Sequence, residues 1–182
     1  MSTAKYLEVY NYDGSPAQPL DMGAGRLDLT NAADPGVILY PPSLSYGLVT
    51  TGTQQVMSFE VKSVATEVET YTLSTLYTGD GFGATTALPG FTVSPATLVL
   101  GPGESASVQV TFDPAGLDYG DNQGYIILDG ETYDAHLPAW ARLAPLPAEA
   151  DVLIVSNDSS WLLGFPSYVD YYTSALDELG LT

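Results

Sequence analysis

The middle of the chain alternates apolar and polar residues with the period of a β-strand. Within Gln55–Val61, the side chains of Met57, Phe59 and Val61 fall on one face, which we expect to be buried. Ser105–Phe112 alternates in the same way. The other segments expected as strands are Thr70–Tyr77, Phe91–Val93, Leu98–Leu100, Tyr125–Leu128 and Tyr133–Leu143.

These segments have the number and spacing of the strands of a β-sandwich. About seven short strands with turns at about every ten residues are typical of immunoglobulin-like folds. We therefore predict an all-β chain, with an immunoglobulin- or fibronectin type III-like β-sandwich of about seven strands over residues 41–145. Pro138 lies inside the last predicted strand, which predicts an edge strand or a bulge there.

The two ends of the chain differ from this middle part. Residues 1–40 are rich in Gly, Pro, Asp and Asn and predict an irregular N-terminal segment. In residues 146–182 the apolar run Val152–Val155 suits a buried parallel strand. Residues at helical spacing follow it, namely Val169, Tyr172, Leu176 and Leu179. One β-α unit cannot build a parallel sheet, so we interpret it as the truncated start of an α/β domain.

Charge and cysteine content exclude several classes of protein. The chain carries 22 acidic and 4 basic residues, a formal net charge of −18. Nucleic acids and anionic membranes require basic patches, so neither is expected as a partner. No run of about 20 apolar residues predicts a membrane span. The absence of cysteine excludes disulfides, thiolate zinc sites and a cysteine nucleophile.

The acidity allows two interpretations, solubility in an extracellular medium or calcium binding. The calcium candidates are the oxygen-rich residues Asp113, Asp118, Asp121 and Asn122. Calcium takes about six to eight oxygen ligands, but these residues lack the spacing of an EF-hand. A solvated loop is therefore the favoured interpretation, and no other metal or cofactor is expected.

The single histidine, His136, is the one candidate for acid–base chemistry. A Ser–His–Asp triad requires a histidine within hydrogen-bond reach of a serine and oriented by a carboxylate. His136 lies in a predicted strand, in the sequence Asp-Ala-His-Leu-Pro, which favours a structural, partly buried histidine. We expect no catalytic residue in this chain.

Three motifs in the first part of the chain resemble the end of the protease domain of subtilisin-like serine proteases. Met1–Ala4 is similar to the end of the helix that follows the catalytic serine in that family. Asp21–Ala32, which contains Gly23-Ala24-Gly25, and then Ala33–Val37 resemble two later motifs in the same order. The resemblance assigns residues 1–40 to the C-terminal remnant of a protease domain.

The following residues resemble the fibronectin type III-like domain that often comes next in this family. The matching segments are Pro42–Tyr46, Phe91–Pro95, Leu98–Leu100, Ser107–Phe112, Gly124–Leu128 and His136–Ala139. The resemblance implies a non-catalytic accessory domain of a secreted, bacterial-type serine endopeptidase. Its implied role is to stabilise the protease or to position a substrate or partner. Its implied partner is the upstream catalytic domain of the same parent chain. The family's catalytic Asp, His and Ser have no counterpart here.

Two other functions remain open at this stage. An immunoglobulin-like surface module could bind carbohydrate or protein through exposed rows of its 13 tyrosines. A loop at Asp151–Ser160 could carry chemistry at the end of a parallel strand. The two ends of the chain should be disordered, packed on the sandwich, or exchanged between chains in a homo-oligomer.

Overall fold

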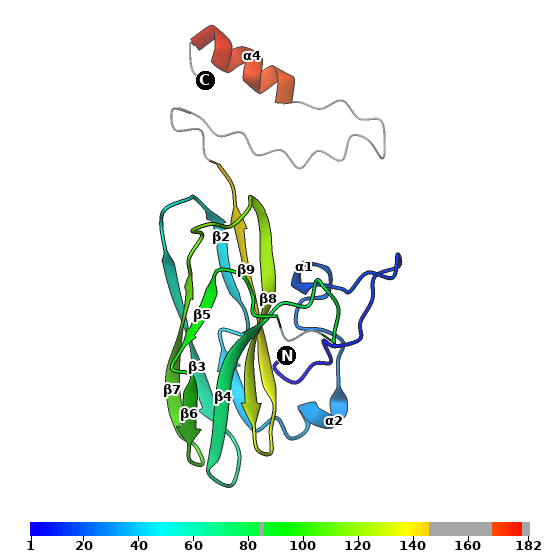
Figure 1. The fold of residues 1–182 in the computed structure, drawn as a ribbon, viewed down its shortest axis with the longest axis vertical. Helices are drawn as coiled ribbons and strands as arrows, with labels where there is room; N and C mark the ends of the chain where they lie inside the picture. The colour runs from blue at the N-terminus through cyan, green and yellow to red at the C-terminus, as the bar shows by residue number, and fades with distance from the viewer. Residues whose placement is uncertain (84–85, 146–168, 180–182) are drawn as a thin grey trace. The chain divides into compact units, whose positions relative to one another are not determined.

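Two β-sheets packed face to face form the body of the protein in a computed structural model, which describes residues 1–83, 86–145 and 169–179. One sheet has the order β1-β3-β7-β5 and the other β2-β9-β8-β4-β6 (Figure 1). The strands are β1 (Val37–Tyr40), β2 (Leu44–Val49), β3 (Gln55–Ser63), β4 (Glu69–Leu76), β5 (Phe91–Ser94), β6 (Thr97–Leu100), β7 (Ser105–Phe112), β8 (Gly120–Gly130) and β9 (Ala135–Leu143).

The core lies between the two sheets and follows from the alternating pattern. In β3 the side chains of Phe59 and Val61 are buried and Met57 is half-buried, while the intervening residues are exposed. In β7 Val108, Val110 and Phe112 are buried in the same core. The predicted all-β, immunoglobulin-like sandwich is therefore confirmed.

Nine strands are present in the described part of the chain, where about seven were expected. The sandwich begins with β1 at Val37 rather than at residue 41, because Val37 and Leu39 point into the core and β1 pairs with β3. β8 is also longer than predicted. It extends back from the predicted strand Tyr125–Leu128 because the polar residues Gly120–Gln123 pair with the end of β9 through backbone groups, and this pairing does not depend on the side chains.

The expectation that Pro138 marks an edge strand is wrong, because β9 lies between β2 and β8. The backbone N–H of His136 points away from β8 and donates to the Ser2 carbonyl. The nitrogen of Pro138, two residues on, faces the same side. Pairing with β2 begins only at Ala139, so no strand partner lacks a donor at Pro138. The irregularity in this pairing lies in β2, between Ser45 and Leu48.

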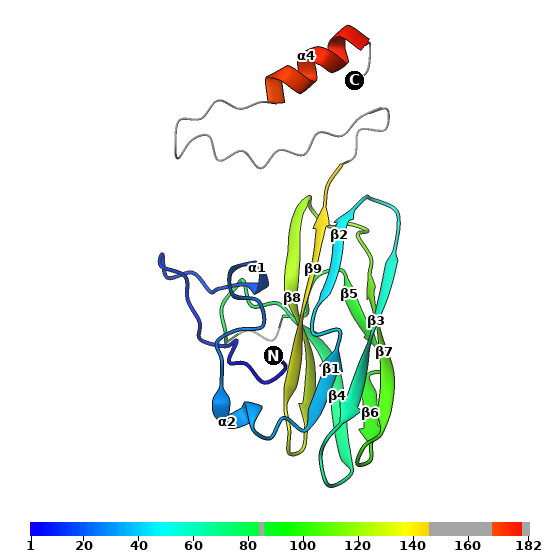
Figure 2. The ribbon, with the colours of Figure 1, turned by 180° about the vertical axis from the view of Figure 1, so that it is seen from behind.

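Residues 1–36, called here the N-terminal segment, belong to the same compact unit as the sandwich, which spans Met1–Ala144. The segment contains two single-turn helices, α1 (Pro19–Met22) and α2 (Leu29–Ala32), joined by irregular loops. It lies beside β8 and β9, on the side away from β3 and β7 (Figures 1 and 2). Of the three outcomes expected for this end of the chain, packing on the sandwich is the one observed.

The second compact unit spans Pro145–Thr182 and is described only for the helix α4 (Val169–Leu179). This helix confirms the helical spacing of Val169, Tyr172, Leu176 and Leu179. The predicted strand at Val152–Val155 and the loop Asp151–Ser160 lie outside the described residues. Among the described helices, none is long and apolar enough to cross a membrane.

Candidate functional site

The most elaborate polar and aromatic arrangement of the sandwich lies on the outer face of the β8–β9 hairpin. Both faces of this hairpin are covered, the inner one by the opposite sheet and the outer one by the N-terminal segment. The sequence also indicates that both faces of β8 are buried, although a search for alternating residues does not detect it. The run Tyr125–Leu128 is apolar at every position, which is typical of a strand buried on both faces.

The N-terminal segment is closed on itself by a short backbone seam. Lys5 and Arg26 exchange two hydrogen bonds, with N···O distances of 2.8 and 2.9 Å. Gly25 makes this close approach possible, because a Cβ atom there would lie 2.5 Å from the Lys5 carbonyl oxygen. Its φ of +113° is also a conformation that other residues adopt poorly. The glycine-rich motif therefore has a structural role in this seam.

The two short helices are held by local capping. At α1, the carboxylate of Asp21 accepts a hydrogen bond from the backbone N–H of Gln18, Pro19 opens the helix, and the helix ends at Gly23 with a φ of +63°. At α2, the carboxylate of Asp28 accepts hydrogen bonds from the backbone of Thr30 and Asn31. These caps set the course of the chain across the outer face of the hairpin.

His136 is the main polar contact between the segment and the sandwich. Its side chain projects from β9 into the interface and the residue is only 4% exposed. Its Nε2 lies 2.7 Å from the carbonyl oxygen of Ala24. Because a carbonyl can only accept, Nε2 carries the proton and donates it. The backbone N–H of His136 donates to the Ser2 carbonyl at 2.9 Å, so this one residue binds the segment at two points.

Aromatic rings surround this histidine. The ring of Tyr6 lies 4.2 Å from the His136 ring and 4.6 Å from the Tyr125 ring, measured between centroids. Each such pair contributes about 0.5–1.5 kcal/mol beyond the area it buries. Burial raises the pKa of Tyr6, and the carboxylates of Asp134 and Asp129 add to this rise. Burial also raises the pKa of Tyr125, so both phenols stay neutral at physiological pH.

Further hydrogen bonds fix the segment along its length. The Tyr125 hydroxyl donates to the Gly23 carbonyl, and the Leu20 N–H donates to the side-chain oxygen of Gln123 at 2.8 Å. At the far end the Tyr133 hydroxyl donates to the carboxylate of Asp34 at 3.2 Å. The Asp34 carboxylate raises the pKa of Tyr133.

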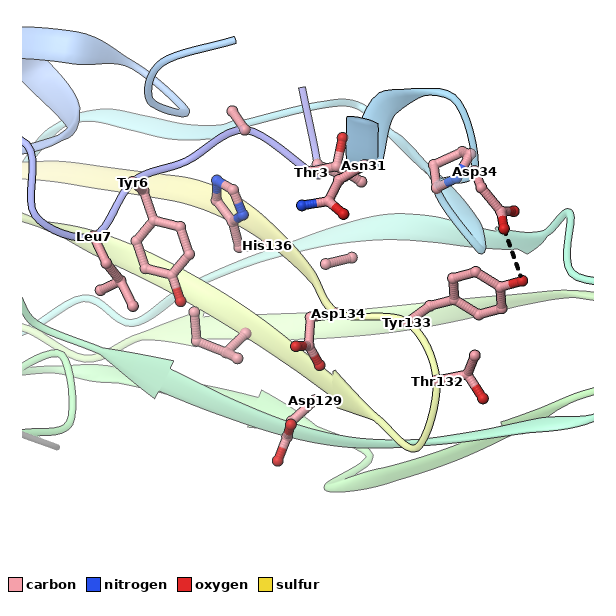
Figure 3. Close-up of a pocket in the computed structure, with 15 residues that line it drawn as sticks. Thr3, Tyr6, Leu7, Asn31, Asp34, Asp129, Thr132, Tyr133, Asp134 and His136 are labelled. Atoms are coloured by element: carbon pink, nitrogen blue, oxygen red, sulfur yellow. Dashed lines mark hydrogen bonds between the residues drawn. The ribbon is translucent and has the colours of Figure 1, made fainter. Parts of the chain in front are cut away.

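A cavity of about 390 Å³ remains between the segment and the hairpin. Tyr6 and His136 lie at one end and the Asp34–Tyr133 pair at the other, with Asp129 and Asp134 between them (Figure 3). In the described part of the chain, no three Asp, Glu, Cys or His side chains are placed to hold a metal ion. The His136 ring is hydrogen-bonded to the Ala24 carbonyl, and no serine hydroxyl among the described residues is hydrogen-bonded to this ring.

Three of the four calcium candidates, Asp113, Asp121 and Asn122, have protein partners of their own. Asp113 accepts hydrogen bonds from Gln54 and from the backbone of Ala115. Asp121 accepts hydrogen bonds from Trp140 and Arg142 across the β8–β9 pair.

The other two candidates lie close to Asp121. Asn122 donates to the Gly120 carbonyl, and Asp118 lies in the loop before β8. Calcium binding by Asp113, Asp118, Asp121 and Asn122 stays a prediction.

Within residues 1–83, 86–145 and 169–179, the exposed tyrosines do not form a row on one sheet. Tyr10 and Tyr12 lie in loops of the N-terminal segment, Tyr40 on β1 and Tyr119 just before β8. The outward tyrosine of the β8–β9 hairpin, Tyr125, is covered by the segment.

No family model matches the sequence, and no curated protein is similar to it. Among solved structures, the chain resembles a PapD-like domain of human CEP192, with 20% identity and a TM-score of 0.48, over 62% of this chain and 87% of that one. It also resembles the E. coli chaperone DraB, with 10% identity and a TM-score of 0.46, over 62% and 57% of the two chains. The Vibrio cholerae VesB protease matches at 19% identity and a TM-score of 0.41, over 64% of this chain and 34% of that one.

The order and packing of the two sheets define the fold class of this protein. The chain is an immunoglobulin-like β-sandwich module with an N-terminal segment built onto one outer face.

Proposed function

We propose that this chain is a non-catalytic accessory module of a secreted subtilisin-like serine endopeptidase, which couples the end of the protease domain to a β-sandwich. One observation carries the proposal. Residues that resemble the subtilisin-like motifs make several of the hydrogen bonds that hold the segment on the sandwich. Gly23 and Ala24 supply carbonyls to Tyr125 and His136, and Asp34 binds Tyr133.

The surface of the N-terminal segment supports a further contact with an upstream domain. Met1, Leu20, Leu27 and Leu29 are each more than half exposed. Exposed large apolar side chains are a feature of interaction surfaces. In the proposed parent protein, this surface would be covered by the catalytic domain and would stabilise it.

The first test is the parent protein itself. We expect the coding sequence before Met1 to encode the family's catalytic Asp, His and Ser. The full-length protein should hydrolyse casein and be labelled by a fluorophosphonate probe on that upstream serine. The 182-residue chain alone should show neither reaction. Labelling of a serine within this chain, or an upstream sequence without the triad, would contradict the proposal.

The stabilising role has its own test in the full-length protein. Leu27→Asp places a charge in the surface assigned to the protease contact, and we expect it to shorten the thermal inactivation half-life of the protease. Complete burial of one leucine is worth about 1.5–3 kcal/mol. Val99→Asp, at an exposed position on β6, is the matched control and should leave the half-life unchanged. Equal effects of the two substitutions would argue against the assigned contact.

A further inference from the structure

His136 occupies a special place in the attachment of the N-terminal segment. It is the only histidine in the sequence, so no other side chain has an ordinary pKa between about 5 and 7.5. Its ring is buried between the sandwich and the segment and binds the Ala24 carbonyl in its neutral form. A change in its charge would therefore act directly on this interface.

The groups that face His136 decide which charge state the interface favours. Burial lowers the pKa of His136. The carbonyls of Ala24 and Ser2 oppose this shift but do not reverse it. Tyr6 from the segment and Tyr125 from β8 contact the ring and are neutral at these pH values.

Carboxylates line the same cavity. They come from Asp129 and Asp134 on the hairpin side and from Asp34 of the segment.

We propose that His136 is a pH-sensitive latch, which holds the N-terminal segment on the sandwich at neutral pH and weakens this attachment as the pH falls below about 6.5. The inference does not rest on the link to a protease, because it concerns only contacts within Met1–Ala144.

The direction follows from proton linkage. In the attached state the imidazole is buried and neutral. In a detached state it would be exposed to water and would take up a proton at its ordinary pKa of about 6.5. The detached state therefore binds more protons, and acidification favours it. The attachment is at full strength above this pH and loses up to tenfold in its equilibrium constant for each pH unit below it, until the attached state also binds a proton.

Amide hydrogen exchange between pH 7.5 and 5.5 tests the latch, after correction for intrinsic exchange rates. The amides of His136 and Leu20 report on the interface, because each donates a hydrogen bond across it. We expect their protection to fall as the pH is lowered, while amides in β3 and β7 keep theirs. Constant protection of both interface amides over this range would overturn the proposal.

The variant His136→Gln separates this histidine from every other titrating group. Glutamine offers an N–H donor for the Ala24 carbonyl but has no charge to gain. We expect interface protection in this variant to be independent of pH. A decline equal to that of the unmodified protein would assign the effect to another titrating group and overturn the latch.

NMR titration of the imidazole keeps the test decisive if this variant fails to fold. The latch requires a His136 pKa below about 6.5. A measured pKa at or above about 6.5 would mean that acidification does not favour detachment of the segment, and would overturn the latch.

Discussion

The β8–β9 hairpin is buried on both of its faces, but the two faces are covered by different kinds of contact. On the inner face, aliphatic side chains such as Ile126, Leu128 and Leu137 pack against the opposite sheet. On the outer face, aromatic rings and hydrogen bonds to the carbonyls of Gly23 and Ala24 hold an irregular segment.

This difference predicts two levels of stability in one compact unit. Apolar burial is non-directional and is distributed over many side chains of the inner core, at about 25 cal/mol for each Å² removed from water. The outer layer depends on a few directed hydrogen bonds, each with a net value of about 1 kcal/mol. The N-terminal segment should therefore open locally, well below the free energy needed to unfold the sandwich.

The largest effect is expected from the inner face. Leu128→Ala removes a fully buried side chain of β8 and should lower the free energy of unfolding by about 2–5 kcal/mol. Urea denaturation followed by fluorescence measures this loss. Val99→Ala, at an exposed position, should change the free energy by less than about 0.5 kcal/mol. If Leu128→Ala cost as little as its control, the inner face would not be the dominant core.

On the outer face, Tyr6→Ala should loosen the segment without unfolding the sandwich. It removes two ring contacts and part of an apolar surface, for a loss of about 2 kcal/mol in the attachment. Exchange of the Leu20 amide should become roughly 30-fold faster by this arithmetic, while amides of β3 stay protected. Tyr12→Ala, at a fully exposed position, should have no effect. Loss of protection in both regions together would show that the two layers are not separable.

A backbone substitution tests the seam within the segment. Gly25→Ala would place a Cβ atom against the Lys5 carbonyl and should weaken the attachment by about 1–2 kcal/mol. The control is Gly14→Ala, because Gly14 also has a positive φ but no atom lies within 4 Å of its Cβ position. Thermal unfolding and limited proteolysis of the segment would measure the effect of each substitution. Equal effects would attribute the loss to backbone conformation alone and not to the close approach.

The smallest expected effect concerns the turn between β8 and β9. The buried carboxylate of Glu69 accepts a hydrogen bond from the backbone N–H of Thr132, which lowers the pKa of Glu69. Its stabilisation should be complete above a pH of about 4.3 and should be lost as the pH falls through the lower pKa of the folded state.

The substitution Glu69→Gln therefore should cost about 1 kcal/mol at pH 7 and nothing at a pH of about 2. Glu67→Gln, at an exposed position, is the control. Urea denaturation at both pH values gives the comparison, and a cost independent of pH would exclude the carboxylate as its source.

Much of the sandwich could be predicted because its strands carry a local pattern. In β7, and in β3 from Met57 onward, apolar and polar residues alternate, and the exposed and buried faces follow directly. The length of β8 could not be predicted, since Gly120–Gln123 pair through backbone atoms with a strand distant in the sequence. The central place of β9 was missed because Pro138 suggests an edge strand. Its nitrogen lies between the backbone contact of His136 with Ser2 and the start of the pairing with β2 at Ala139, where no donor is required.

The candidate site shows the same difference between features set by local pattern and features set by contacts between distant residues. The sequence by itself determined the fold class, the acidic character and the presence of one histidine, since these depend on composition and short-range periodicity. Only the tertiary structure decided that His136 meets Ala24 and Tyr6, because these residues lie far apart in the chain and no local pattern links them. The motifs at Gly23 and Asp34 could be recognised in the sequence, but their carbonyl and carboxylate contacts arise only when the chain folds back onto β8 and β9.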